Sequence, residues 1–273
     1  MLHHVVIPLS LKESEQKIIS MGRLLRYFGT KHVSLVHVRT SIKKNKKEER
    51  LTDAVRAYAL KLRELGFEVD MYFKQGHVAS EILTIAAELE ADFISILWER
   101  KWVLQKALLG NVEDDVVRMA DRPVFVYKHS IFLAKEQKMS QAMYATNFQS
   151  TDSHVMPYLT NPDFATQTLF ILHVGERAPD PKAEAERRKK IQENLKRLKA
   201  ECEHAFYEIK TLDVVGHPGS KIVRTARWHG VDLLIIGKCD TQSTFEQIMG
   251  STAQLIAEKA NCSIFIVPGA QRR

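Results

Sequence analysis

Glycine and hydroxyl side chains follow an apolar run near the end of the chain. The run Val231–Gly237 leads through Lys238 to Asp240, and after nine intervening residues Gly250-Ser251-Thr252 opens an amphipathic segment. Glycine lets backbone amides approach an anion, and the first-turn amides of a helix and the two hydroxyls can donate to phosphate oxygens. The spacing therefore predicts a strand, a loop and a helix N-terminus that can hold phosphate groups.

The sequence contains none of the common catalytic motifs. It contains no G-x-S-x-G, Walker A, HExxH or paired-carboxylate pattern. His77 and His217 each precede a helical segment without an acidic partner at motif spacing, so we expect them to cap or pack. His37 and His173 end apolar runs and are interpreted as features of the fold. We therefore expect neither a catalytic residue nor a metal site.

Residues of the first half recur in the second half at a constant spacing. Gly76-His77 returns as Gly216-His217, and the same offset of 140 relates six further pairs. These pairs are Ile82/Ile222, Ala86/Ala226, Asp92/Asp232, Gly110/Gly250, Ala120/Ala260 and Phe125/Phe265. The opening segments match at 136 or 137, as in Val36-His37-Val38 with Leu172-His173-Val174. Such regular self-similarity indicates a duplicated unit.

Each copy alternates short apolar runs with longer amphipathic ones, which is typical of parallel strands joined by crossover helices. We predict an α/β fold of two tandem, open, five-stranded parallel sheets with flanking helices. The strands expected in the first copy are 4–9, 32–38, 68–74, 93–97 and 124–127, with helices at 12–28, 48–65, 79–90 and 110–120. Those expected in the second are 142–146, 168–174, 207–214, 233–237 and 264–267. Between 150 and 167, Pro157 and Pro162 predict only a short helix and an irregular loop.

The length of 273 residues suits two domains, because single cores seldom grow beyond about 250–300 residues. The predicted bounds are an N-terminal domain at 1–130, a linker at 131–140 and a C-terminal domain at 141–273. No run reaches the roughly 18 apolar residues that span a bilayer, and no signal peptide opens the chain. We therefore expect a cytoplasmic protein without a membrane partner. Three cysteines without a CxxC pair suggest neither disulfides nor zinc.

The formal net charge of +7 raises the question of nucleic-acid binding. Most of the excess lies in the segments 43–47 and 187–190, and each has glutamates nearby at helical spacing. Such charge runs are usually solvated faces of helices. We do not expect a nucleic-acid partner.

The pattern Gly237-x2-Asp240-x9-Gly250-Ser251, followed by a helix and the strand Cys262–Pro268, resembles the universal stress protein family. Its ATP-binding members carry G-x2-G-x9-G-S/T here. Tyr144-Ala145-Thr146-Asn147-Phe148 is similar to the family's Y-P-T-D-F, and the resemblance covers both copies. It implies a Rossmann-like fold of the adenine nucleotide alpha hydrolase type, with the two units of a tandem member packed as a pseudo-dimer.

The resemblance also implies a nucleotide pocket in the second copy. Its adenine side would be formed by Ala145, Thr146, Asn147 and Val174. Phosphates and ribose would meet Gly237, Lys238, Asp240, Gly250, Ser251 and Thr252. The implied cofactor is ATP or ADP, with magnesium only if the nucleotide is bound.

Three departures from the family pattern affect this pocket. Asp240 replaces a glycine, Asn147 replaces an aspartate, and Ala253 stands where a hydroxyl is common. Two unit charges about 4 Å apart repel by roughly 4 kcal/mol at an effective dielectric near 20, so Asp240 would weaken phosphate binding unless Lys238 compensates.

The first copy departs further from the pattern. Leu97 and Arg100 occupy the two glycine positions, and Asn111 replaces the serine. Bulky side chains would fill the space of a pyrophosphate, so we expect a structural partner with a degenerate site. The alternative is a more apolar ligand against Trp98 and Trp102.

The leading hypothesis is a non-enzymatic stress or regulatory protein that acts through protein partners, forms a homodimer, and binds an adenine nucleotide in its second copy. Two alternatives remain open. One is a nucleotide-independent scaffold. The other is a slow ATPase that holds a metal near Asp240, since a divalent cation could lie between the carboxylate and the phosphates.

Overall fold

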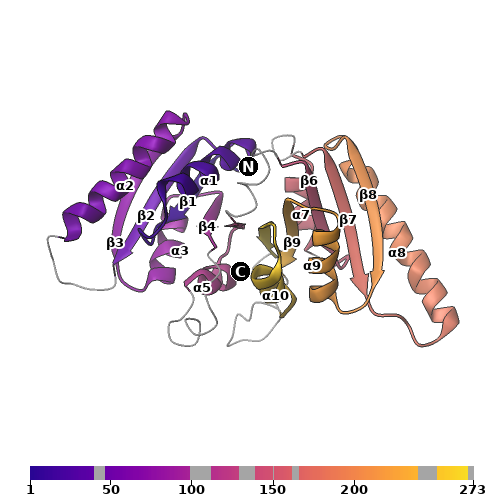
Figure 1. Ribbon diagram of the computed structural model, residues 1–273. Helices are drawn as coiled ribbons and strands as arrows, with labels where there is room; N and C mark the ends of the chain where they lie inside the picture. The colour runs from indigo at the N-terminus through magenta and orange to yellow at the C-terminus, as the bar shows by residue number, and fades with distance from the viewer. Residues whose placement is uncertain are drawn as a thin grey trace. The chain divides into compact units, whose positions relative to one another are not determined.

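The chain divides into two compact units, Met1–Lys138 (unit 1) and Met139–Arg273 (unit 2), in the computed structural model (Figure 1). The structure describes residues 1–39, 47–98, 112–128, 139–149, 151–161, 166–238 and 251–269, and of residues 47–51 and 251 it describes the backbone only. The predicted linker lies almost wholly outside these ranges. The predicted domain bounds and the pseudo-dimer packing stay predictions.

Unit 1 is a five-stranded parallel sheet with flanking helices. Its strands are β1 (His4–Pro8), β2 (His32–Arg39), β3 (Glu68–Gln75), β4 (Phe93–Leu97) and β5 (Val124–Tyr127). Its helices are α1 (Glu15–Tyr27), α2 (Lys47–Glu64), α3 (Val78–Glu88) and α5 (Val112–Met119). The strand order is β3-β2-β1-β4-β5, so the order reverses between β1 and β4.

Unit 2 repeats this arrangement. Its strands are β6 (Gln141–Thr146), β7 (Thr168–Gly175), β8 (Glu208–Val215), β9 (Leu233–Lys238) and β10 (Ser263–Pro268), in the order β8-β7-β6-β9-β10. Its helices are α7 (Asp152–Leu159), α8 (Pro181–Cys202), α9 (Pro218–Trp228) and α10 (Ser251–Lys259). The predicted α/β class with two parallel five-stranded sheets is confirmed.

Burial along the strands explains their hydrophobic pattern. The inner residues of β1 and the first four residues of β4 are buried, as expected for strands covered by helices on both faces. The outer strand β3 alternates more strongly, with Val69 buried between the exposed Glu68 and Asp70. The mainly apolar runs of β1 and β4 therefore fit inner strands, and the mixed run of β3 fits an outer one.

The repeated aspartates Asp92 and Asp232 connect the first strand of each unit to the fourth. Asp92 Oδ2 accepts hydrogen bonds from the backbone amides of His3 and His4, at 2.7 and 3.0 Å. Asp232 Oδ2 accepts from the amides of Ser140 and Gln141, at 2.9 and 3.0 Å. These carboxylates hold the chain where it enters β1 and β6, which gives their recurrence at the offset of 140 a structural reason.

The connection after β6 differs from the prediction in one detail. A short helix is present as expected, but Pro157 lies inside α7 rather than ending it. The helix has eight residues, and a proline there removes a single backbone donor. A two-turn helix can lose that bond near its C-terminal end. Pro162 lies outside the described residues.

No helix in the described part of the chain has the length and hydropathy needed to cross a bilayer.

Candidate functional site

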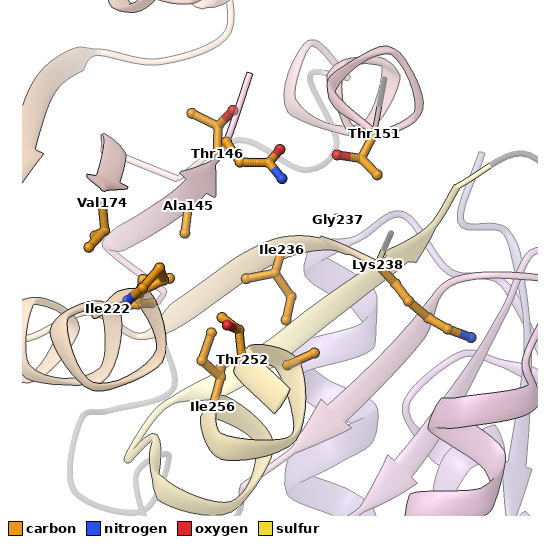
Figure 2. A pocket seen from close by; sticks show the side chains of 13 residues that line it. Ala145, Thr146, Thr151, Val174, Ile222, Ile236, Gly237, Lys238, Thr252 and Ile256 are labelled. Carbon is orange, nitrogen blue, oxygen red and sulfur yellow. The ribbon is translucent and has the colours of Figure 1, made fainter. Parts of the chain in front are cut away.

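A pocket of about 290 Å³ opens in unit 2 where the strand order reverses, at the carboxyl ends of β6 and β9. In an open parallel sheet this crevice is the usual place for ligands, because the crossover helices leave it in opposite directions. The ends of β6, β7 and β9 form one side of the pocket, and α9 and α10 form the other (Figure 2).

Seven of the ten predicted site residues line this pocket. They are Ala145, Thr146, Asn147, Val174, Gly237, Lys238 and Thr252. Asp240 and Gly250 lie outside the described residues, and only the backbone of Ser251 is described. The effect of Asp240 on phosphate binding therefore stays a prediction.

Gly237 is in close contact with the start of α7. A Cβ atom built at Gly237 would lie 2.7 Å from Cβ and 2.9 Å from Oγ1 of Thr151. Distances below 3.0 Å do not occur for real Cβ atoms, so no other residue fits here without a shift of α7. The first glycine of the motif is therefore required by strand–helix packing, in addition to any role beside phosphate.

Thr146 is part of a buried hydrogen-bond network. Its hydroxyl donates to Asp152 Oδ1 at 2.8 Å and accepts from the backbone amide of Phe148 at 2.8 Å. The hydroxyl of Tyr144 donates to the same Asp152 oxygen at 2.5 Å. Because the single proton of Thr146 is used by Asp152, this hydroxyl holds the turn after β6 and has no proton left to donate to a ligand.

Burial raises the pKa of Tyr144 well above its usual range, and the neighbouring Asp152 carboxylate adds to the rise. Both causes disfavour a second negative charge beside Asp152. Tyr144 therefore stays protonated and keeps donating its hydrogen bond.

The turn after β6 ends in a stacked pair of rings. Phe148 has a φ of 58°, in the left-handed region that bulky residues rarely adopt. Its ring stacks on His173 with centroids 4.8 Å apart and planes 13° apart. His173 Nδ1 lies 3.1 Å from Asp213 Oδ1, so Nδ1 donates to that carboxylate. These contacts hold the backbone of the turn beside the pocket, while Asn147 Oδ1 accepts from the amide of Gln149.

Lys238 is the last residue of β9 and is buried. Its side chain points away from the other labelled lining residues (Figure 2). The compensation that we predicted between Lys238 and Asp240 stays untested.

Six lining residues were not among the predicted site residues. They are Thr151, Pro218, Ile222, Ile236, Ala253 and Ile256. The duplication carries a signal for several of them, because Ile222 and Ile236 repeat Ile82 and Ile96 at the offset of 140. Helical spacing also relates Thr252 to Ile256. Nothing in the sequence distinguishes these positions from ordinary core.

The first unit also has a pocket at its switch point, of about 360 Å³. Leu97 was expected to fill this space, yet it lies in the wall of an open pocket. Trp98 is not among the described lining residues, and Lys128 Nζ lies 5.8 Å from the centre of its ring. Trp102 lies outside the described residues. The loss of nucleotide binding in unit 1 stays a prediction.

No group of three or more His, Cys, Asp or Glu side chains suited to a metal ion occurs within the described ranges. The chemistry available in unit 2 is that of an apolar pocket at a helix N-terminus. The isoleucines and valine can cover a flat apolar ring, while Thr252 and the first-turn amides of α10 can donate to an anion.

Together, the duplicated doubly wound sheet and the pocket at the switch point define a tandem protein of the open, parallel α/β class. The chain belongs to the universal stress protein family, which it matches over residues 28–128 and 163–268. The membership that the loop motif predicted is confirmed.

Relatives support the tandem organisation. A universal stress protein structure from Archaeoglobus fulgidus DSM 4304 has a TM-score of 0.77 at 16% identity, covering 100% of this chain and 98% of that one. A functionally unknown protein from Pseudomonas aeruginosa PAO1 has a TM-score of 0.74 at 16% identity, covering 98% and 93%. These two likenesses establish the fold.

A curated universal stress protein of Methanocaldococcus jannaschii is 31% identical over 73 residues. The match spans 27% of this chain and 45% of that relative, which is less than half its length.

Proposed function

We propose that this chain is a non-enzymatic stress or regulatory protein that binds an adenine nucleotide in the pocket of unit 2. The observation that carries the proposal is the pocket between β6, β9 and the N-terminus of α10, with an apolar wall and the Thr252 hydroxyl. A base can be enclosed by Val174, Ile222 and Ile236, while phosphates lie near the positive end of the α10 dipole.

The absence of catalysis is supported by the same lining. Among the described residues of this pocket, Lys238 is the single ionisable one, and its side chain points away from the others. General acid–base chemistry needs a proton donor or acceptor within hydrogen-bond reach of the substrate. We expect phosphate release from ATP to stay at the level of the buffer, with or without magnesium.

One universal stress protein has been solved in complex with cAMP, and one from Archaeoglobus fulgidus has been solved in complex with dAMP. The binding of these nucleotides was observed for those two proteins. The present proposal rests on the pocket and on the motif quoted above.

The test is isothermal titration of the full chain with ATP, ADP and AMP, using variants that exchange matched positions between the units. Ala253→Glu gives unit 2 the carboxylate that unit 1 has at position 113. We expect this change to weaken ATP binding by at least about tenfold, since like charges repel in a partly dry pocket.

The matched control is Glu113→Ala, which makes the reverse change in unit 1 and should leave ATP binding unaltered. Circular dichroism of both variants checks that they fold. A wild-type chain that binds none of the three nucleotides would overturn the proposal and favour the nucleotide-independent scaffold.

A further inference from the structure

The pockets of the two units are lined by the same positions of the repeat. Eleven of the thirteen residues that line the unit 2 pocket have their repeat partner in the wall of the unit 1 pocket. The partners in unit 1 are Pro8, Leu9, Ser10, Val38, Val78, Ile82, Ile96, Leu97, Val112, Glu113 and Val116. The unit 1 pocket of about 360 Å³ is within the roughly 300–1,000 Å³ of typical ligand sites.

The residues that differ between the pockets make the unit 1 pocket less suited to an anionic ligand than the unit 2 pocket. Leu9 and Val112 in unit 1 replace Thr146 and Thr252, so unit 1 lacks the Thr252 hydroxyl that could donate to an anion. Glu113 replaces Ala253 in the first turn of the last helix. A carboxylate at that place opposes the binding of an anion at the helix N-terminus.

A second carboxylate lies in the same pocket wall. Glu13 Oε1 accepts from the backbone amide of Ser10 at 2.9 Å and from its hydroxyl at 2.6 Å. Glu13 Oε2 is buried and has no hydrogen-bond partner within the described part of the chain. A buried carboxylate oxygen without a donor is costly, so a ligand that displaces the groups covering this oxygen and supplies an N–H to it would be favoured.

The sign of the charge around the pocket follows from its other polar residues. Lys12 is an exposed member of the wall, and it offsets one of the two glutamates. His37 Nδ1 lies 2.9 Å from the carbonyl oxygen of Leu9, so that nitrogen donates and is not available to accept from a ligand. The described lining therefore carries one more negative than positive side chain, over walls that are otherwise aliphatic.

We propose that the unit 1 pocket binds a small organic cation, an ammonium group carried on an apolar or aromatic body. The body fills the space between Ile82, Ile96 and Val116, and the ammonium group meets the carboxylates of Glu13 and Glu113. This site differs from the nucleotide pocket of unit 2 in place and in the sign of its ligand. The inference stands whether or not unit 2 binds a nucleotide.

The experiment compares three probes of similar shape and different charge on the full chain. Tryptamine is the cation, tryptophol is neutral and indole-3-propionate is the anion. Binding is measured by isothermal titration, and the site is located by methyl NMR of Leu9, Val112 and Val116. We expect tryptamine to bind with one equivalent, to shift these methyl signals, and to bind at least about tenfold more tightly than the other two probes.

Two charge-removing variants test the assigned side chains. We expect Glu13→Gln and Glu113→Gln each to weaken tryptamine binding several-fold, because each removes one of the two negative charges that meet the ammonium group. The matched control is Glu88→Gln, which removes a surface carboxylate of the same unit that pairs with Lys74 at 3.2 Å. Thermal melting verifies that all three variants fold.

The proposal is overturned if tryptamine does not bind at millimolar concentration. It is equally overturned if indole-3-propionate binds as tightly as tryptamine, if the methyl shifts fall in unit 2, or if Glu88→Gln weakens binding as much as the two pocket variants do.

Discussion

At the scale of single residues, the glycine and the threonine of the site each have a structural reason independent of any ligand. Gly237 leaves room for Thr151, and Thr146 bonds to Asp152 and to the amide of Phe148. A motif residue can therefore persist because a helix packs against it. Substitutions at these positions can separate an effect on ligand binding from an effect on the stability of the fold.

We predict that Gly237→Ala destabilises the chain by about 1–3 kcal/mol, because the added Cβ overlaps Thr151 and α7 must shift. Urea denaturation followed by circular dichroism measures the change. The matched control is Gly219→Ala in α9, where the added Cβ would meet Leu255 at an ordinary 3.4 Å. If Gly237→Ala is no more harmful than this control, the packing explanation is wrong.

We predict that Tyr144→Phe lowers the free energy of unfolding by about 1–3 kcal/mol, since a buried hydroxyl that donates to Asp152 at 2.5 Å is lost. The same denaturation assay applies. Tyr207 is 97% exposed, so Tyr207→Phe is a suitable control and should change stability little. Equal effects of the two substitutions would contradict the role assigned to the network.

At the scale of elements, the start of α8 is stabilised by two acidic side chains, Asp180 and Glu184. The helix has Asp180 as its N-cap, whose side chain accepts from the amide of Ala183, and Pro181 follows it. Glu184 Oε2 accepts from the amide of Ala178 at 2.9 Å and from Arg187 Nε at 2.8 Å. Its Oε1 accepts from Arg188 Nε at 2.8 Å. The carboxylate thus connects the loop after β7 to the helix.

Hydrogen bonds from Arg187, and then from Arg188 and the Ala178 amide, hold the pKa of Glu184 well below its usual 4.5. A folded-state pKa below the unfolded one stabilises the fold only where the group is ionised. The contribution is therefore complete above about pH 4.5 and is lost as the pH falls toward the folded-state pKa.

We predict that Glu184→Gln destabilises the chain at pH 7 and that its difference from the wild type shrinks steadily below about pH 4.5. Urea denaturation at several pH values measures this difference. Glu186→Gln changes an exposed residue of the same helix and serves as the control. A difference that stays constant down to about pH 3 would contradict the assigned ion pairs.

At the scale of the whole molecule, duplication has produced two pockets at the same positions of the repeat that differ in a few polar side chains. Unit 2 has Thr252 and Ala253 at the start of its last helix, whereas unit 1 has Val112 and Glu113 there. The two proposals assign a different ligand to each unit.

We predict that ATP and tryptamine bind to the full chain together, with one equivalent of each and without competition. Because each ligand has its own pocket, a saturating amount of one should change the dissociation constant of the other by less than about threefold. Sequential isothermal titrations in both orders measure this. Displacement of one ligand by the other would show that they share a site.

Much of the architecture could be predicted from the sequence, because its determinants are local or repetitive. Continuous apolar runs such as Phe93–Leu97 and Leu233–Lys238 must be buried on both faces, which requires parallel strands covered by helices. The constant offset of 140 predicts the duplication directly. Proline also predicted a short connection after β6, although Pro157 is tolerated inside α7.

The site could be predicted only in part, because its geometry depends on contacts between distant segments. The loop motif indicated Gly237 and Thr252, but the contact of Gly237 with Thr151 crosses from β9 to α7 and leaves no local pattern. The unit 1 pocket is a similar case. Leucine in place of glycine at position 97 predicts a filled site, yet Leu97 lies in the wall of a pocket. Whether a bulky side chain closes a pocket depends on how the surrounding helices are spaced, and that spacing is set by tertiary packing.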